Sequence, residues 1–230
     1  MKTPEVIVFD VNETLSDTAP LGAAFQDAGL PAHAAQTWFT GILRDGFALA
    51  AAGGNVPFAE IAKDSLERLM AQAAAGAAAV SERSQRVDQI MTSMKDLSLH
   101  PDVVLGIPAL ARTADLVTLS NGATTVADKL LSEGHIREYF SHLLSVDDAA
   151  AWKPAAAAYS TAMAACGKAA EEMLLVAVHP WDIHGANAAG MQTAWINRDG
   201  NTYPSYFTPP TYEAVDLPSL AEQLALRPTH

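Results

Sequence analysis

The sequence has one cysteine, little positive charge and no long apolar run, and each shortage excludes a class of protein. A single cysteine, Cys166, rules out any disulfide within the chain. Only 14 lysines and arginines stand against 26 aspartates and glutamates, a formal net charge of −12. Such a surface repels the phosphates of nucleic acids and of anionic lipids. We therefore expect no nucleic-acid partner and no membrane partner.

The apolar runs are also too short to cross a bilayer. The most apolar stretch, from Met70 to Val80, is rich in alanine and falls far short of the roughly 20 residues of a spanning helix. The strand-like run from Glu5 to Val11 begins close to Met1, without the charged leader and apolar core of a secretion signal. We expect no membrane span and a cytoplasmic location.

The composition that is present suits a globular enzyme. Half of the 230 residues are hydrophobic and only 17% are charged, which is typical of a chain that buries a sizeable core. The length fits either one domain that carries a large insertion or two modest domains.

Strand and helix patterns alternate along most of the chain. Short apolar runs bounded by turn residues predict strands at Glu5–Val11, Asp115–Asn121, His142–Val146, Met173–Val178, Thr193–Asn197 and Ala214–Asp216. Helical patterns occupy Thr124–Glu133, Pro154–Cys166, Trp181–Ala189 and Pro218–Leu226. This alternation predicts the α/β class, with a Rossmann-like, doubly wound parallel sheet as the core.

The segment from 16 to 97 differs from the rest. It offers helical patterns but no strand of comparable quality: Ala32–Ala51, Phe58–Ala75 and Glu82–Met94. We predict that 16–97 is an inserted α-helical cap domain and that 1–15 and 98–230 form the core domain. Because ligands of open α/β sheets bind at the carboxyl edge of the strands, we expect the cap to lie at that edge.

Asp10 ends the first predicted strand and is followed by a polar turn. From this segment alone, Asp10 either points into a cleft or caps a following helix. Three later segments bear on the choice, because each follows a predicted strand or precedes a helix at the same edge of the sheet. They carry Ser120, Lys153 and Asp182.

In this order, the four segments resemble the sequence motifs of the haloacid dehalogenase-like superfamily: a nucleophilic aspartate, a serine or threonine, a lysine and a distal acid. The resemblance covers nearly the whole chain, including a helical insertion after the first motif. Phosphatases of that superfamily typically have a second aspartate as general acid two residues after the nucleophile, where this chain has Asn12. They usually also have a richer acidic cluster for magnesium in the last motif, where this chain has only Asp182.

Both departures disfavour phosphoryl transfer. Asn12 fits the type II 2-haloacid dehalogenases of the superfamily, because halide leaves without a proton. The resemblance implies that Asp10 displaces the halide and that Lys153 takes the place of a metal, so we expect no cofactor and no metal. Thr14 would orient Asp10. The expected substrate-binding residues are Asn12, Ser120, Asn121, Arg44, Tyr159 and Trp181.

Water would then hydrolyse the ester on Asp10 and release a 2-hydroxy acid. Either Asp182 or His179 would activate the water, while backbone N–H groups near Val11 and Asn12 stabilise the oxyanion. Ser120 and the neighbouring N–H groups would hold the carboxylate of the substrate.

Two places depart from the family pattern. The arginine that receives the halide is expected on a cap helix after a tryptophan, but Thr40 and Gly41 stand there. Arg44, about one helical turn further on, either takes that role or pairs with Asp45 or solvent. The last motif has His179 where the family commonly has asparagine, so His179 is either a general base or a packing residue.

We therefore predict hydrolysis of short 2-haloacids. A phosphatase acting on a small phosphate ester and a catalytically impaired relative that binds small carboxylates remain as alternatives. A homodimer is consistent with the resemblance.

Overall fold

The computed structural model describes residues 2–73, 80–149 and 151–226. Contacts divide the chain into two compact units. One consists of Met1–Ser16 and Ser98–His230, and the other of Asp17–Leu97.

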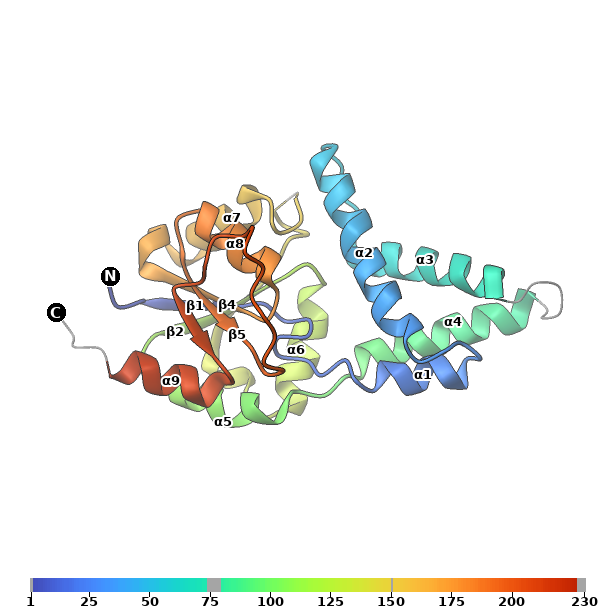
Figure 1. Cartoon of the computed structure of the whole chain (residues 1–230), viewed down its shortest axis with the longest axis horizontal. Helices are drawn as coiled ribbons and strands as arrows, with labels where there is room; N and C mark the ends of the chain where they lie inside the picture. The colour runs from blue at the N-terminus through green and yellow to red at the C-terminus, as the bar shows by residue number, and fades with distance from the viewer. Residues whose placement is uncertain (1, 74–79, 150, 227–230) are drawn as a thin grey trace. The chain divides into compact units, whose positions relative to one another are not determined.

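The first unit is built on a six-stranded parallel sheet with the order β3-β2-β1-β4-β5-β6. Figure 1 labels β1, β2, β4 and β5 of this sheet. The strands are β1 (Val6–Phe9), β2 (Asp115–Ser120), β3 (Phe140–Ser145), β4 (Met173–Ala177), β5 (Gln192–Ile196) and β6 (Tyr212–Ala214). Strand β1 lies between β2 and β4. The predicted α/β class with a doubly wound parallel sheet and an inserted helical segment is confirmed.

Helices cover both faces of the sheet because the strands are apolar on both sides. Ile7 and Phe9 of β1 share one buried cluster with α5 (Pro101–Leu110), α6 (Thr124–Glu133) and α9 (Leu217–Ala225). Val6 and Val8 point to the other face, toward α7 (Ala156–Cys166) and α8 (Pro180–Ala188). Because all paired strands run parallel, the polar residues that follow them lie at the same, carboxyl edge of the sheet.

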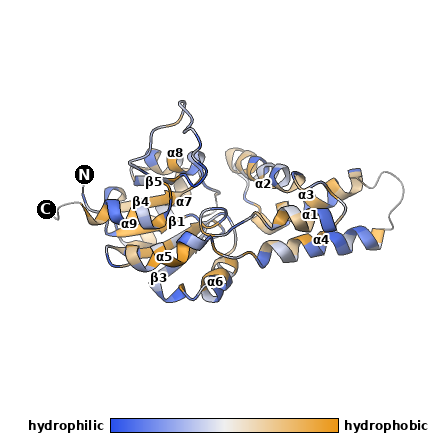
Figure 2. Ribbon diagram, turned by 60° about the horizontal axis from the view of Figure 1, so that its bottom comes forward, coloured by the Kyte–Doolittle hydropathy of each residue, from blue (hydrophilic) through white to orange (hydrophobic). Residues whose placement is uncertain are grey.

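The second unit consists of α1 (Leu21–Asp27), α2 (Ala34–Ala51), α3 (Phe58–Ala73) and α4 (Val80–Lys95). Trp38 of α2 packs against Phe25 of α1 and donates its indole N–H to the Ala62 carbonyl of α3, at 3.1 Å. Most of α4 is hydrophilic (Figure 2), and its buried residues are Val87 and Ile90.

Most predicted elements occur within two residues of their expected bounds, but α1 and α5 were not predicted. Gly106 and Pro108 argue against a helix at α5 on propensity. The glycine is needed there because α9 packs closely: a Cβ on Gly106 would lie 2.3 Å from the Cβ of Leu217. Helix α7 begins at Ala156 rather than at the expected Pro154.

The predicted helix Phe58–Ala75 is observed as far as Ala73, and its last two residues lie outside the described residues. Within the described ranges, no helix combines the length and apolar character needed to cross a bilayer.

Candidate active site

Asp10 lies at the carboxyl end of the central strand β1. Its N–H bonds the Val176 carbonyl of β4 at 3.0 Å, which continues the ladder one residue past the strand. The Thr14 hydroxyl donates to Asp10 Oδ2 at 2.7 Å and accepts the N–H of Val178 at 3.1 Å. The Asp10 carboxylate is therefore oriented by Thr14, whose hydroxyl is itself held by the residue after β4.

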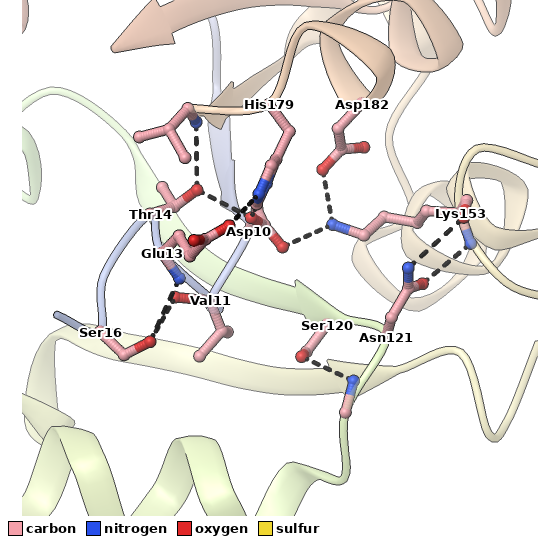
Figure 3. A network of polar contacts seen from close by, with 12 residues as sticks. Asp10, Val11, Glu13, Thr14, Ser16, Ser120, Asn121, Lys153, His179 and Asp182 are labelled. Atoms are coloured by element: carbon pink, nitrogen blue, oxygen red, sulfur yellow. Dashed lines mark hydrogen bonds and ion pairs between the residues drawn. The ribbon is translucent and has the colours of Figure 1, made fainter. Parts of the chain in front are cut away.

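Lys153 bridges two carboxylates in the protein interior (Figure 3). Its ammonium lies 2.9 Å from Asp10 Oδ1 and 2.6 Å from Asp182 Oδ2, and its side chain is 0% exposed. The Asn121 side chain fixes the backbone of Lys153, accepting its N–H at 2.9 Å and donating to its carbonyl at 3.4 Å. The predicted lysine, nucleophile and distal acid thus meet at one point.

These contacts determine which groups are charged. Burial by itself would raise the pKa of Asp10, but the charge of Lys153 and the hydrogen bond from His179 hold that pKa well below its ordinary value. Burial would likewise lower the pKa of Lys153, but the charges of Asp10 and Asp182 raise it. Asp10 is ionised at neutral pH, as a nucleophile must be.

Asp182 is in the first turn of α8, fully buried, with both carboxylate oxygens bonded. The Tyr159 hydroxyl of α7 donates to Asp182 Oδ1 at 2.6 Å. Burial raises the pKa of Asp182, and the Lys153 charge opposes that rise. Close approach of α7 and α8 makes these contacts, since a Cβ on Gly185 would lie 2.5 Å from the Tyr159 hydroxyl oxygen.

His179 connects Asp10 with a second acid, Glu13. Nδ1 of the ring lies 3.1 Å from Asp10 Oδ2, and Nε2 lies 2.8 Å from Glu13 Oε2. The ring stacks on Trp181 with 5.0 Å between centroids. Burial would lower the pKa of His179, but the hydrogen bonds and charges of Asp10 and Glu13 raise it to about 9. His179 is therefore an imidazolium that donates to both carboxylates at neutral pH.

Sequence reasoning missed Glu13. The residue has φ 61°, in the left-handed region that costs a non-glycine residue about 1–2 kcal/mol. This conformation turns the chain sharply after β1, and Glu13 reaches His179 from there. The available signal was a carboxylate in the polar turn after the nucleophile, but nothing in the sequence pairs it with a histidine far along the chain.

The other predicted binding residues belong to different units: Asn12, Ser120 and Trp181 are in the first unit, and Arg44 is in the second. Ser120 ends β2, and its Oγ accepts the N–H of Gly122 at 2.9 Å. That N–H is therefore directed at Ser120 instead of at a substrate, while the Ser120 hydroxyl proton can still be donated. Asn12 lies nearby, since a Cβ on Gly122 would be 3.8 Å from its Nδ2. The Trp181 ring centroid lies 5.9 Å from the Lys153 ammonium.

Arg44 belongs to the other unit. It is on α2, and its Nε pairs with Asp45 Oδ1 at 2.8 Å, with 75% of its side chain exposed. Its proposed role as a halide ligand stays a prediction.

A metal would have to share the acidic centre with an ammonium group. Lys153 itself occupies the space between the carboxylates of Asp10 and Asp182. Across 2–73, 80–149 and 151–226, no group of three or more His, Cys, Asp or Glu side chains could hold a metal ion.

Several proteins of similar sequence or structure are named as haloacid dehalogenases. A family model described as haloacid dehalogenase-like hydrolase matches residues 4–190. The haloacetate dehalogenase H-2 of Moraxella sp. (strain B) is 37% identical over 125 residues, 52% of this chain and 56% of that protein. An (S)-2-haloacid dehalogenase of Pseudomonas sp. (strain YL) is 36% identical over 111 residues, 48% of each chain.

In these two alignments the chain spans about half the length of the curated relatives it matches. The solved L-2-haloacid dehalogenase of Xanthobacter autotrophicus superposes with a TM-score of 0.83 at 20% identity, covering 97% of this chain and 99% of that one. That likeness shows the fold over nearly all of this chain.

Proposed function

The chain belongs to the haloacid dehalogenase-like hydrolases, and we propose that it hydrolyses short 2-haloacids to 2-hydroxy acids through an ester on Asp10. One observation carries the proposal: a fully buried ammonium, that of Lys153, lies between the carboxylates of Asp10 and Asp182. It keeps the nucleophile ionised in a buried position without a divalent cation. The amide of Asn12, two residues after Asp10, cannot act as the general acid that an alkoxide leaving group needs, whereas halide leaves as an anion.

The contacts of Asp10 indicate which oxygen attacks. Oδ2 accepts hydrogen bonds from Thr14 and from His179, whereas Oδ1 accepts one from Lys153. A carboxylate oxygen has about two lone-pair sites, so Oδ1 keeps one for the substrate. Oδ1 forms the bond to C2, the carbon–halogen bond breaks, and halide leaves with the bonding electrons.

The substrate is an anion in an acidic protein, so it needs local positive charge. Lys153 and the imidazolium of His179 supply that charge beside Asp10. The Ser120 hydroxyl at the end of β2 is the proposed donor to the substrate carboxylate.

Ester formation also changes the charge that His179 experiences. Once Asp10 is an ester, one of the two carboxylates that raise the pKa of His179 is gone. The ring can then release its Nδ1 proton to solvent and accept a proton from the water that attacks the Asp10 carbonyl. When the bond between Cγ and Oδ1 breaks, the ring gives that proton to the departing alkoxide oxygen, and the 2-hydroxy acid leaves. Glu13 keeps Nε2 protonated and the ring oriented, while the Thr14 hydroxyl stabilises the oxyanion on Oδ2.

Asp182 is the less suitable base of the two considered. Both of its oxygens accept hydrogen bonds, from Lys153 and from Tyr159, and the residue is 0% exposed. We propose that Asp182 positions Lys153 and that His179 activates the water.

The names of the two curated relatives suggest the substrates to test first, haloacetates and (S)-2-haloacids. We would measure halide release from chloroacetate and from each enantiomer of 2-chloropropionate. For any of these that is a substrate, the rate should be the same with and without a chelator. Phosphate released from a small phosphate ester in a chelator-sensitive way, with no halide from any haloacid, would contradict the proposal. The homodimer and the cytoplasmic location stay predictions, which light scattering and cell fractionation would check.

A further inference from the structure

The turn after Asp10 is held through its backbone by residues from two other segments. The Glu13 carbonyl accepts the Nε2–H of His100 at 3.0 Å, and the Thr14 carbonyl accepts Nη2–H of Arg198 at 3.0 Å. The Leu15 carbonyl accepts the backbone N–H of His100 at 2.9 Å. Three consecutive carbonyls of the turn are therefore bound from outside it.

Arg198 is itself fixed by an ion pair. Its Nε and Nη2 each lie 3.0 Å from an oxygen of Asp102, in the two-point geometry that suits a guanidinium and a carboxylate. Asp102 Oδ2 also accepts the N–H of Leu217 at the start of α9, at 3.1 Å. The side chains of Arg198 and Asp102 are 18% and 15% exposed. We call His100, Asp102 and Arg198 the carbonyl clamp.

The carbonyl clamp acts on the residues that determine the geometry around the nucleophile. Glu13 has left-handed backbone geometry and sends its carboxylate to His179, while Thr14, next in the chain, sends its hydroxyl to Asp10. Both directions depend on the dihedral angles of Glu13, which relax toward common values if nothing holds the turn.

We propose that the carbonyl clamp is a set of positioning residues for the reaction: it holds the strained turn so that Thr14 meets Asp10 and Glu13 meets His179. This inference rests on the proposed function for its kinetic consequences, although the contacts themselves do not depend on any substrate. The alternative is that the same residues only stabilise the packing of α5 and α9 against the sheet.

A second arginine offers a matched control. Arg137 donates from Nε to Asp128 at 2.8 Å and from Nη1 to the Phe140 carbonyl at 2.8 Å. It makes the same two kinds of contact as Arg198, but at the start of β3 and away from the Asp10 turn. Arg137→Met should therefore leave the kinetics unchanged.

The variants to compare are Arg198→Met, Arg198→Lys, His100→Leu, His100→Gln and Arg137→Met. Misplacement of catalytic groups by about 1 Å costs on the order of 100-fold in rate. We expect Arg198→Met and His100→Leu to lower kcat for halide release by about 10- to 100-fold, with KM within about threefold. His100→Gln keeps a donor for the Glu13 carbonyl and should recover most of kcat, whereas Arg198→Lys cannot serve both oxygens of Asp102.

A readout without substrate completes the test. In both loss variants, NMR titration of the His179 ring should show its pKa moving from about 9 toward the ordinary 6.5, because Glu13 no longer reaches the ring. If these residues are purely structural, their substitution should lower the urea midpoint of unfolding but leave kcat and the pKa of His179 unchanged. That result would overturn the inference. If Arg198→Met does not fold, His100→Leu decides, since it leaves the Arg198–Asp102 pair intact. If the wild type releases no halide, the proposed function fails while the titration still tests the carbonyl clamp.

Discussion

Replacing His179 with glutamine separates the two halves of the proposed reaction. Glutamine can still donate a hydrogen bond toward Asp10 or Glu13, but it cannot accept a proton from water. In the variant, ester formation on Asp10 should proceed while ester hydrolysis nearly stops. The ester should therefore accumulate during turnover.

The structure sets the size of both effects. A general base contributes about 10²–10⁴ in rate, so hydrolysis should slow by about 3–5 kcal/mol of barrier. Ester formation should slow less than about tenfold, since Lys153 remains 2.9 Å from Asp10 and keeps it ionised. Loss of Glu13 by Glu13→Gln should have a smaller effect of about tenfold on hydrolysis, because His179 keeps its ring and loses only its orienting partner.

Rapid quenching followed by mass spectrometry of the peptide that contains Asp10 measures the ester directly. His184→Gln is the matched control: His184 is on α8, the helix that begins directly after His179, but it bonds Thr208 at 3.2 Å. That variant should turn over without accumulating ester. If His179→Gln shows no ester and keeps its steady-state rate while Asp182→Asn accumulates ester, our choice of His179 as the base is refuted.

Three further predictions concern the stability and charge of the site. Lys153→Met leaves two buried carboxylates without their cation, so halide release should disappear and urea unfolding should show a loss of about 3–5 kcal/mol; wild-type stability would contradict this. Gly185→Ala forces a Cβ to within 2.5 Å of the Tyr159 hydroxyl oxygen and should cost about 1–3 kcal/mol together with activity. Its control, Gly41→Ala, places a Cβ where no atom lies within 4 Å and should stabilise the protein by about 0.5–1 kcal/mol. The raised pKa of His179 contributes up to about 3 kcal/mol of stability that is complete below pH 6.5 and lost as pH rises through about 9. Stability curves of the wild type and His179→Gln should therefore converge above pH 9, and parallel curves would argue against a charged His179.

The sheet could be predicted from the sequence because its strands are buried on both faces and read as continuous apolar runs. The helix Thr124–Glu133 was predicted with its observed bounds, and the acidic residues after the strands were placed at one edge. Parallel pairing places the carboxyl ends of the strands at one edge of the sheet. The segments that follow β1, β3 and β4 therefore bring Asp10, Lys153 and Asp182 together.

Contacts that depend on turn geometry could not be predicted. Glu13 reaches His179 from a turn in which the φ of Glu13 is 61°, and no residue pattern predicts that conformation for a glutamate. Arg198 and Asp102 are 96 residues apart in the chain, and neither belongs to a motif. Helix α5 was missed for a related reason: Gly106 is required by the packing of α9, which is a property of the folded state.

The central claim is that Asp10 itself, held ionised by Lys153, becomes covalently bonded to the substrate carbon. Single-turnover hydrolysis of chloroacetate in heavy-oxygen water tests this claim most directly, because water that attacks the Asp10 carbonyl leaves its oxygen on the enzyme. We predict heavy oxygen in the peptide that contains Asp10 and none in the first glycolate released. Label that appears only in the glycolate would show that water attacks the substrate directly, and would contradict the account.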